Sequence, residues 1–296
     1  MCAAVGAGVN ALTCAEVAGR CSLGAEPVTW LSALLDGTED QSGTQHRPTP
    51  SPTNPGIPDV AWSQASTLSR AALCTAADLL ARRPDLDRGT LPLIWVTGLG
   101  ELRATEQFLT TLLKRGRGRP RAFRDSVHNT AASLISTHLG LRGSLETLAA
   151  GWSAAGSGLL RAEALVARHG ACLLLGGDDG AMCFDEAAQA RSRPPGRLAV
   201  AGAILEADGP GPVLSIDVTG RPLGPQPASA PTLWAMGPDG PATPAGAIGL
   251  SDVLGGAPST GIVALVACVA SGRGQVVERS GRSWLRSAVG SALHGP

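Results

Sequence analysis

The sequence predicts an α/β fold, because segments of helical spacing alternate with short apolar runs of strand length. The clearest region is Phe123–Asp179, where a run without glycine or proline predicts a helix over Thr130–Leu139. A second helix, rich in alanine and leucine, is predicted over Ser153–Arg168, with Gly170 as its C-cap. A buried strand over Ala171–Leu175 follows, and two glycines close it.

Further elements are expected on both sides of this region, from apolar spacing and from the glycines and prolines that bound each run. Ahead of it we expect a strand within Ala3–Thr13, a surface loop over Asp36–Asp59, helices over Ser66–Arg82 and Glu101–Leu113, and a strand over Leu91–Thr97. Behind it we expect strands over Leu198–Glu206, Pro212–Val218 and Leu233–Met236, a buried helix within Leu254–Ala270, and a last strand with the start of a helix over Gln275–Arg286. The first two of these later strands are joined by a short turn, which predicts an antiparallel neighbouring pair.

The composition is that of a globular chain of 296 residues, with 44% hydrophobic and 16% charged residues. Basic and acidic residues both number 24, so the zero net charge favours neither nucleic acid nor an anionic membrane as a partner. No apolar run is long enough to span a membrane, and no signal peptide is expected. Seven cysteines at spacings that match no zinc site indicate buried thiols in a reducing compartment. We therefore expect a cytoplasmic protein without metal or cofactor.

Two short motifs match enzyme signatures only loosely. Gly6, Gly8 and Ala11 satisfy a relaxed dinucleotide fingerprint, but the preceding strand would be very short and no βαβ unit with a ribose-binding acid follows. The run Gly151–Ala155 resembles a hydrolase elbow, but it ends in alanine. The partners that such a serine needs would have to come from a distant acid and from His294. We expect neither activity.

A more specific resemblance lies in the central region. The run Ser126–Ala132 (Ser-Val-His-Asn-Thr-Ala-Ala) is similar to the segment before the nucleophile in the β-ketoacyl synthases. Thr147–Gly156 resembles the nucleophile turn of that family, and the glycines after Leu175 resemble the next strand end. The resemblance implies a thiolase-like layered αβαβα fold. It implies a ketosynthase-like N-terminal half over residues 1–220 and a shortened C-terminal half of the same unit over residues 221–296.

The catalytic set of this family is where the sequence departs from the resemblance. Active members hold the acyl chain on a cysteine and use two hydrogen-bond donors, usually histidines, beside the reacting carbonyl. The resemblance places Ser153 at the cysteine position and Met236 and Asp252 at the two histidine positions. The only histidine after His169 is His294, so the C-terminal half cannot supply a histidine pair.

Two groups of residues are candidates for binding. The acyl-pocket candidates are His128, Asn129, Trp152 and Ser153, although His128 at a helix start is more simply a structural histidine. The second group is basic and consists of Lys114, Arg115, Arg117, Arg119, Arg121 and Arg124. It is either a solvated loop or a docking surface for an acidic acyl carrier protein and the phosphate of its phosphopantetheine arm.

Together these features predict a non-condensing subunit of the chain-length-factor type in a fatty acid, polyketide or polyene pathway. Such a subunit keeps the fold, lacks the cysteine and pairs with an active β-ketoacyl synthase in a heterodimer, with a homodimer as the other arrangement. The alternative is an active acyltransferase or condensing enzyme of the same family that uses Ser153 as the acyl acceptor. That alternative requires a base beside the hydroxyl, and the sequence identifies none.

Overall fold

A computed structural model describes residues 12–21, 53–179, 198–207, 209, 211–219, 232–235, 243, 247–250, 260–271, 273–280 and 283–290. The strands are β1 (Leu12–Cys21), β2 (Leu93–Thr97), β3 (Leu145–Ala149), β4 (Ala171–Asp178), β5 (Ala199–Ala207), β6 (Val213–Thr219), β7 (Thr232–Ala235), β8 (Ala247–Gly249), β9 (Gly274–Ser280) and β10 (Ser283–Gly290). The helices are α2 (Asp59–Gln64), α3 (Thr67–Arg82), α4 (Leu102–Arg115), α5 (Pro120–Arg124), α6 (Thr130–Leu139), the 3-10 turn η1 (Gly151–Ser153), α7 (Ala154–His169) and α10 (Thr260–Ala270).

The described strands form one sheet of ten strands, and its two halves have the same internal strand order. The full order is β3-β2-β4-β5-β1-β6-β10-β9-β7-β8. If β6 to β10 are renumbered from one, the second five strands mirror the first five about the β1–β6 pair. The helices follow the same rule, because α7 joins β3 to β4 and α10 joins β8 to β9. The chain therefore repeats one structural unit, although no repeat is visible in its sequence.

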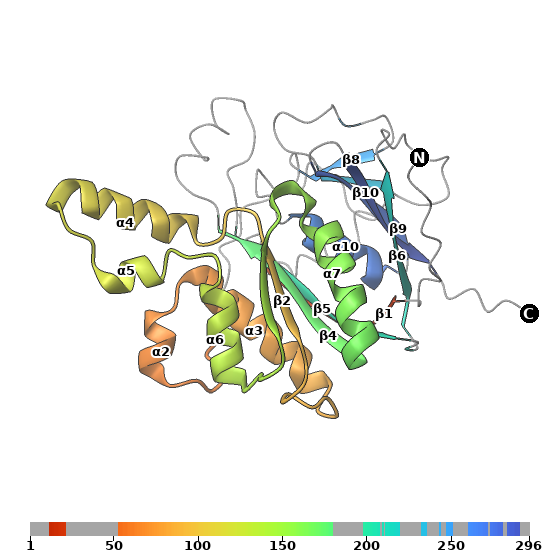
Figure 1. Cartoon of the computed structure of the whole chain (residues 1–296), viewed down its shortest axis with the longest axis horizontal. Coiled ribbons are helices and arrows are strands. Elements are labelled where there is room, and N and C mark those ends of the chain that lie inside the picture. The colour runs from red at the N-terminus through yellow and green to blue at the C-terminus, as the bar shows by residue number, and fades with distance from the viewer. Residues whose placement is uncertain are drawn as a thin grey trace, which may run out of the picture.

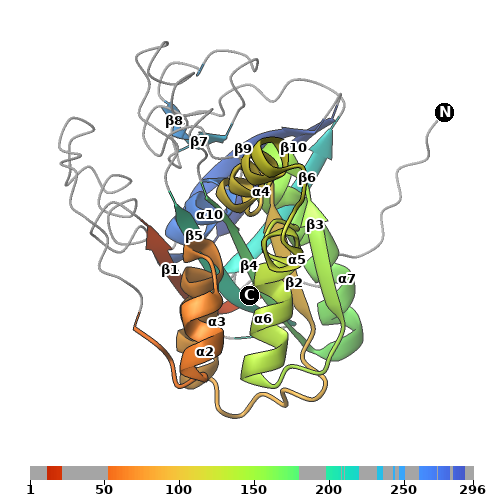
Figure 2. The ribbon, with the colours of Figure 1, turned by 90° about the vertical axis from the view of Figure 1, so that its left-hand side faces the viewer.

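Alternate side chains of the central strands face two different cores, which explains why these strands read as continuous apolar runs. On β2, Ile94 and Val96 pack into the core that contains α7 and α10. Leu93 and Trp95, between them, pack into the core that contains α3 and α6. Figure 1 shows α3 and α6 on one side of β2 and β4 and α7 on the other, and Figure 2 shows the same layers after a quarter turn.

The outer layer is built from the long connections of the first half. Residues 22–92 between β1 and β2 carry α2 and α3, and residues 98–144 between β2 and β3 carry α4 to α6. The equivalent connections of the second half are residues 220–231 and 236–246, that is, 12 and 11 residues. Each is shorter than α3, which alone has 16 residues. The expectation of a shortened second half is confirmed.

Most of the predicted elements are present, and α6 has the predicted bounds. Three expectations are wrong. β5 and β6 are not neighbours, because β1 lies between them and is antiparallel to both. β4 continues through Gly176 and Gly177 to Asp178, because its neighbour β5 pairs along that whole length. The segment after β9 forms a hairpin with β10 rather than starting a helix. Of the predicted first strand within Ala3–Thr13, only Leu12 and Thr13 are described, and they begin β1, which continues to Cys21. Most of the Asp36–Asp59 loop lies outside the described residues.

In the described part of the chain, no helix is both long and apolar enough to cross a membrane.

Candidate functional site

The N-terminus of α7 is the centre of the candidate site. The chain leaves β3 through Gly151, whose φ of 54° is in the left-handed region that glycine adopts without strain. η1 then turns the chain directly into α7. This sharp turn puts Ser153 in the N-cap position of α7, next to the buried residues Ala154, Ala155 and Gly156.

The Ser153 hydroxyl is buried and is hydrogen-bonded within its own turn. Only 3% of the residue is exposed. Its Oγ donates to the carbonyl of Ala150 at 2.8 Å and lies 3.3 Å from the Oγ of Ser157. A serine nucleophile needs a neighbouring base to take its proton, and the described contacts of Ser153 contain none. Trp152, the residue before it, is half-buried in η1.

The described cysteines do not replace this nucleophile. Cys14, Cys172 and Cys268 are buried in the core around α7 and α10. Burial raises the pKa of each of these three thiols to about 12. Cys74, on α3, is also buried. Thiolates are the reactive form of cysteine, so these side chains act as small apolar groups.

A buried carboxylate, which sequence reasoning missed, lies directly against the start of α7. Glu278 on β9 is fully buried, and its Oε1 and Oε2 accept hydrogen bonds from the backbone N–H groups of Ala155 at 2.9 Å and Gly156 at 2.6 Å. Burial raises the pKa of this carboxyl to about 7, although the two N–H groups act to lower it. The sequence contained one sign of this arrangement. Glu278 lies two positions after Val276 on β9, so both side chains point to the same face of the strand, and Val276 faces the core.

The candidates His128 and Asn129 precede α6 and are both exposed. His128 packs against Gly100 in the loop after β2, where a Cβ would lie 3.1 Å from the imidazole Cδ2. Among the described contacts, no hydrogen bond joins His128 to Ser153. Asn129 occupies the N-cap position of α6 without a side-chain cap bond. Met236 and Asp252, expected at the two histidine positions, lie outside the described residues.

The basic residues lie together around α4 and α5. Lys114 and Arg115 end α4, and Arg121 and Arg124 belong to α5. All six predicted basic residues are exposed. Three of them, Arg115, Arg119 and Arg121, line a pocket of about 480 Å³. Its other lining residues are Gln64, Ser66, Ala104, Gln107, Thr111, Ala122 and Asp125. We call this the α4–α5 pocket.

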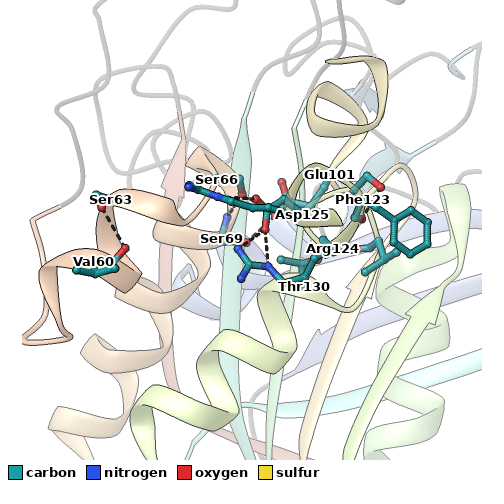
Figure 3. Close-up of polar contacts among 12 residues, drawn as sticks. Val60, Ser63, Ser66, Ser69, Glu101, Phe123, Arg124, Asp125 and Thr130 are labelled. Atoms are coloured by element: carbon teal, nitrogen blue, oxygen red, sulfur yellow. Dashed lines mark hydrogen bonds and ion pairs between the residues drawn. The ribbon is translucent and has the colours of Figure 1, made fainter. Parts of the chain in front are cut away.

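A buried carboxyl, that of Glu101, is hydrogen-bonded to one of the residues that line the α4–α5 pocket. Ser66 lines the pocket, and its hydroxyl donates to Oε1 of Glu101 at 2.6 Å, as the Ser69 hydroxyl also does. Figure 3 shows this cluster beside Asp125, whose carboxylate pairs with Arg124. Burial is the largest influence on Glu101 and raises the pKa of its carboxyl to about 7, whereas the two serine hydroxyls act to lower it.

No group of histidine, cysteine, aspartate and glutamate side chains in the described ranges has the arrangement of a metal site.

Comparisons with known proteins agree with this architecture. Residues 38–224 match the family model for the N-terminal domain of β-ketoacyl synthases. None of the curated proteins matches the sequence. Among solved structures, the chain is similar to the ketosynthase ApeO in complex with its chain length factor ApeC from Xenorhabdus doucetiae, with 17% identity and a TM-score of 0.64 over 94% of this chain and 99% of that chain.

Two further structures have the same arrangement. The ishigamide ketosynthase/chain length factor is 13% identical, with a TM-score of 0.67 over 94% of this chain and 99% of that chain. The type II complex AntDE:AntF, an acyl carrier protein with its ketosynthase, is 11% identical, with a TM-score of 0.69 over 96% of this chain and 99% of that chain. The predicted thiolase-like fold is confirmed.

Proposed function

Because this chain belongs to the β-ketoacyl synthase family, we propose that it is a non-condensing subunit that pairs with an active ketosynthase. In that pairing it would help to shape the acyl tunnel of its partner, as expected of a chain-length-factor-like protein. The observation that carries the proposal is the histidine distribution. After His169 the sequence contains only His294, so the second half cannot supply the histidine pair that stabilises the developing charge in active members.

The surroundings of Ser153 support the same proposal. Its hydroxyl donates to a backbone carbonyl and lies beside another hydroxyl rather than beside a base. The backbone N–H groups of Ala155 and Gly156, in the first turn of α7, already donate to Glu278. A substrate carbonyl near Ser153 would therefore meet no activated nucleophile among the described residues, and the N–H groups of Ala155 and Gly156 would not be free to bind it.

The edge of the sheet is the surface on which we expect the partner. β3 pairs with β2 on one side, and in the described sheet it has no neighbour on the other. The Ala150 N–H donates to Thr97 and the Ser144 carbonyl accepts from Leu93, so the backbone of the even-numbered residues faces β2. The backbone groups of Leu145, Thr147 and Ala149 therefore point outwards. Such an edge is a template for a strand of another chain.

Exposed apolar side chains on three elements are also available to a partner. Leu145 on β3 and Leu160 on α7 are each 40% exposed. On α4, Leu109 is 47% and Leu113 is 84% exposed, and none of the 14 residues of that helix is buried. An amphipathic helix with an uncovered apolar face is characteristic of an interaction site. The similar structures named above include a ketosynthase bound to its chain length factor.

The α4–α5 pocket is the proposed contact for an acyl carrier protein. Arg115, Arg119 and Arg121 bring guanidinium groups to one pocket. Guanidinium groups bind phosphate and carboxylate in a bidentate way. The arm of a carrier ends in a phosphate-linked thiol, and carrier proteins are acidic. AntDE:AntF, one of the similar structures, is a complex of a ketosynthase with its acyl carrier protein.

The second candidate function is acyl transfer through Ser153, which its position at the start of α7 favours. Incubation with acetyl- and malonyl-loaded acyl carrier protein, followed by intact-protein mass spectrometry, separates the two candidates. We expect no adduct on the folded protein. An acyl adduct that is absent from Ser153→Ala would reject the non-condensing role. If the non-condensing role is correct, co-expression with an active ketosynthase should yield a stoichiometric complex of the two chains.

A further inference from the structure

Glu278 lies where the N-termini of the two central helices meet. Its carboxylate accepts hydrogen bonds from Ala155 and Gly156, in the first turn of α7. It also lies against Gly261, the second residue of α10. These helices belong to opposite halves of the chain and pack against each other. One side chain of β9 therefore occupies the positive ends of both.

The surroundings of this carboxylate are shaped to its volume. A Cβ on Gly261 would overlap Oε1 of Glu278, and a Cβ on Gly156 would lie 3.1 Å from Oε2. The same Cβ on Gly156 would lie 2.9 Å from the Cβ of Leu285, which closes the site from β10. Glycine at positions 156 and 261 thus leaves room for one carboxylate and little else.

Among the described residues, only backbone groups act to stabilise the charge of Glu278, and they offset part of the effect of its burial. No described cation forms an ion pair with it, and no charged side chain contributes to the shift of its pKa. Its fully buried carboxyl relies on two N–H donors and on the two helix ends. These are the means by which proteins bind free anions. The two N–H donors, the positive ends of the two helices and the space between them are the features of an anion-binding site.

We propose that the converging N-termini of α7 and α10 form a carboxylate-binding site that the chain fills with its own Glu278 side chain. The site accepts a monocarboxylate of the size of acetate, and Glu278 excludes external ones. This goes beyond the proposed function, since neither partner pairing nor carrier docking depends on what occupies the site. Its test accordingly uses neither a ketosynthase nor a carrier protein.

The variant Glu278→Ala in the full chain provides the test. It removes Cγ, Cδ and both carboxylate oxygens, which correspond atom for atom to the heavy atoms of acetate. Thermal unfolding is followed as sodium acetate replaces sodium chloride at constant ionic strength. We expect the midpoint to rise by about 5–10 °C when acetate reaches about 100 times its Kd. Formate and propionate should give smaller shifts, and neutral acetamide none.

Three controls make the result specific. The wild-type protein should not respond, because its site is full. Glu278→Asp should not respond, because its shorter carboxylate leaves no space for acetate. Glu146→Ala removes a half-buried carboxylate that pairs with Arg161 outside this site, and it too should not respond. A response of Glu278→Ala no larger than that of Glu146→Ala would overturn the proposal.

A refolding experiment tests Glu278→Ala even where the variant does not fold in chloride alone. Refolding from denaturant is then compared in acetate and in chloride. Recovery of the folded far-UV circular dichroism spectrum in acetate only supports the carboxylate site. Equal recovery in both salts, or recovery in neither, counts against it.

Discussion

Asp178 holds the backbone that leaves β2, because its Oδ1 accepts a hydrogen bond from the Thr97 hydroxyl at 2.6 Å. The same oxygen accepts from the N–H groups of Gly98, Leu99 and Gly100 at 3.0, 2.8 and 2.9 Å. β2 and β4 are parallel neighbours, so the carboxylate at the end of one fixes the loop that follows the other. That loop supports His128 and leads into α4.

Replacing this carboxylate should destabilise the protein and release the loop. Asp178→Ala removes the shared acceptor of three backbone N–H groups, and we expect a loss of about 3 kcal/mol in the free energy of unfolding. Urea unfolding measures the loss, and hydrogen exchange should show faster exchange at residues 98–100. Asp85→Ala, which removes an exposed partner of Arg83, should cost much less than Asp178→Ala, because water screens an exposed ion pair. Equal losses in the two variants would contradict this reading.

Glu101 should make stability fall as the pH rises towards neutrality. Burial raises the pKa of its carboxyl from 4.5 to about 7 in the folded protein. Between these values the folded state holds a proton that the unfolded state has lost. The stabilising contribution is therefore complete below about pH 4.5 and is lost as the pH rises through about 7. Its size is about 3 kcal/mol, at about 1.4 kcal/mol per pKa unit.

The variant Glu101→Gln tests this dependence. Its free energy of unfolding should change less with pH between about 4.5 and 7 than that of the wild type, because one titrating group is missing. Asp59→Asn, at an exposed position at the start of α2, should retain the wild-type profile. If Glu101→Gln retains it as well, the carboxyl is not the source of the pH dependence.

Glu278→Gln should remove a second contribution in the same pH window. The pKa of this carboxyl is also raised to about 7, so its stabilising contribution is present at low pH and lost on the way to neutrality. The double variant with Glu101→Gln should have the flattest profile of all. Chemical denaturation at a series of pH values measures each slope. A double variant no flatter than either single one would show that the groups do not titrate independently.

Blocking the free edge of β3 should weaken pairing with a ketosynthase. Thr147 presents its backbone N–H outwards, and Thr147→Pro removes that donor from the edge. We expect at least a tenfold loss of affinity, or about 1.4 kcal/mol. Thr147→Val keeps the N–H group and should bind as the wild type does. Sedimentation of the mixed proteins measures both, and equal affinities would place the interface elsewhere.

Reversing charge in the α4–α5 pocket should weaken carrier binding. The double variant Arg115→Glu/Arg119→Glu changes two of the arginines that line the pocket. Binding of an acidic carrier should fall at least tenfold, and its salt dependence should decrease, since exposed charges act through a screened field. Arg142→Glu, at an exposed position after the far end of α6, is the matched control. Equal binding by all three proteins would reject this docking surface.

Local signals predicted the helices well. α3 begins after Ser66, whose hydroxyl accepts from the Ser69 N–H, and α7 ends at Gly170, which has a φ of 81°. Both ends are set by residues next to the helix, so a short window of sequence contains the information.

Long-range strand pairing was not visible in the sequence. The short turn between β5 and β6 suggested a hairpin, but β1 takes the position between them. β3 was missed because Leu145–Ala149 lies at an edge and carries partly exposed residues without an apolar alternation. Glu278 was missed for a related reason, since its partners Ala155 and Gly156 are more than 120 positions away.

The position of β1 has a consequence for the order of events during synthesis. Cys21 pairs with Ala199 and Leu12 with Ala207, so β1 cannot form these pairs until residues 178 and 195 positions later have been made. At about 5–20 residues per second, this wait lasts roughly 10–40 s. β1, which lies at the centre of the sheet, is therefore synthesised well before its neighbour β5 is available to pair with it. Nascent chains that stop before β5 should remain open to proteases and chaperones at this strand.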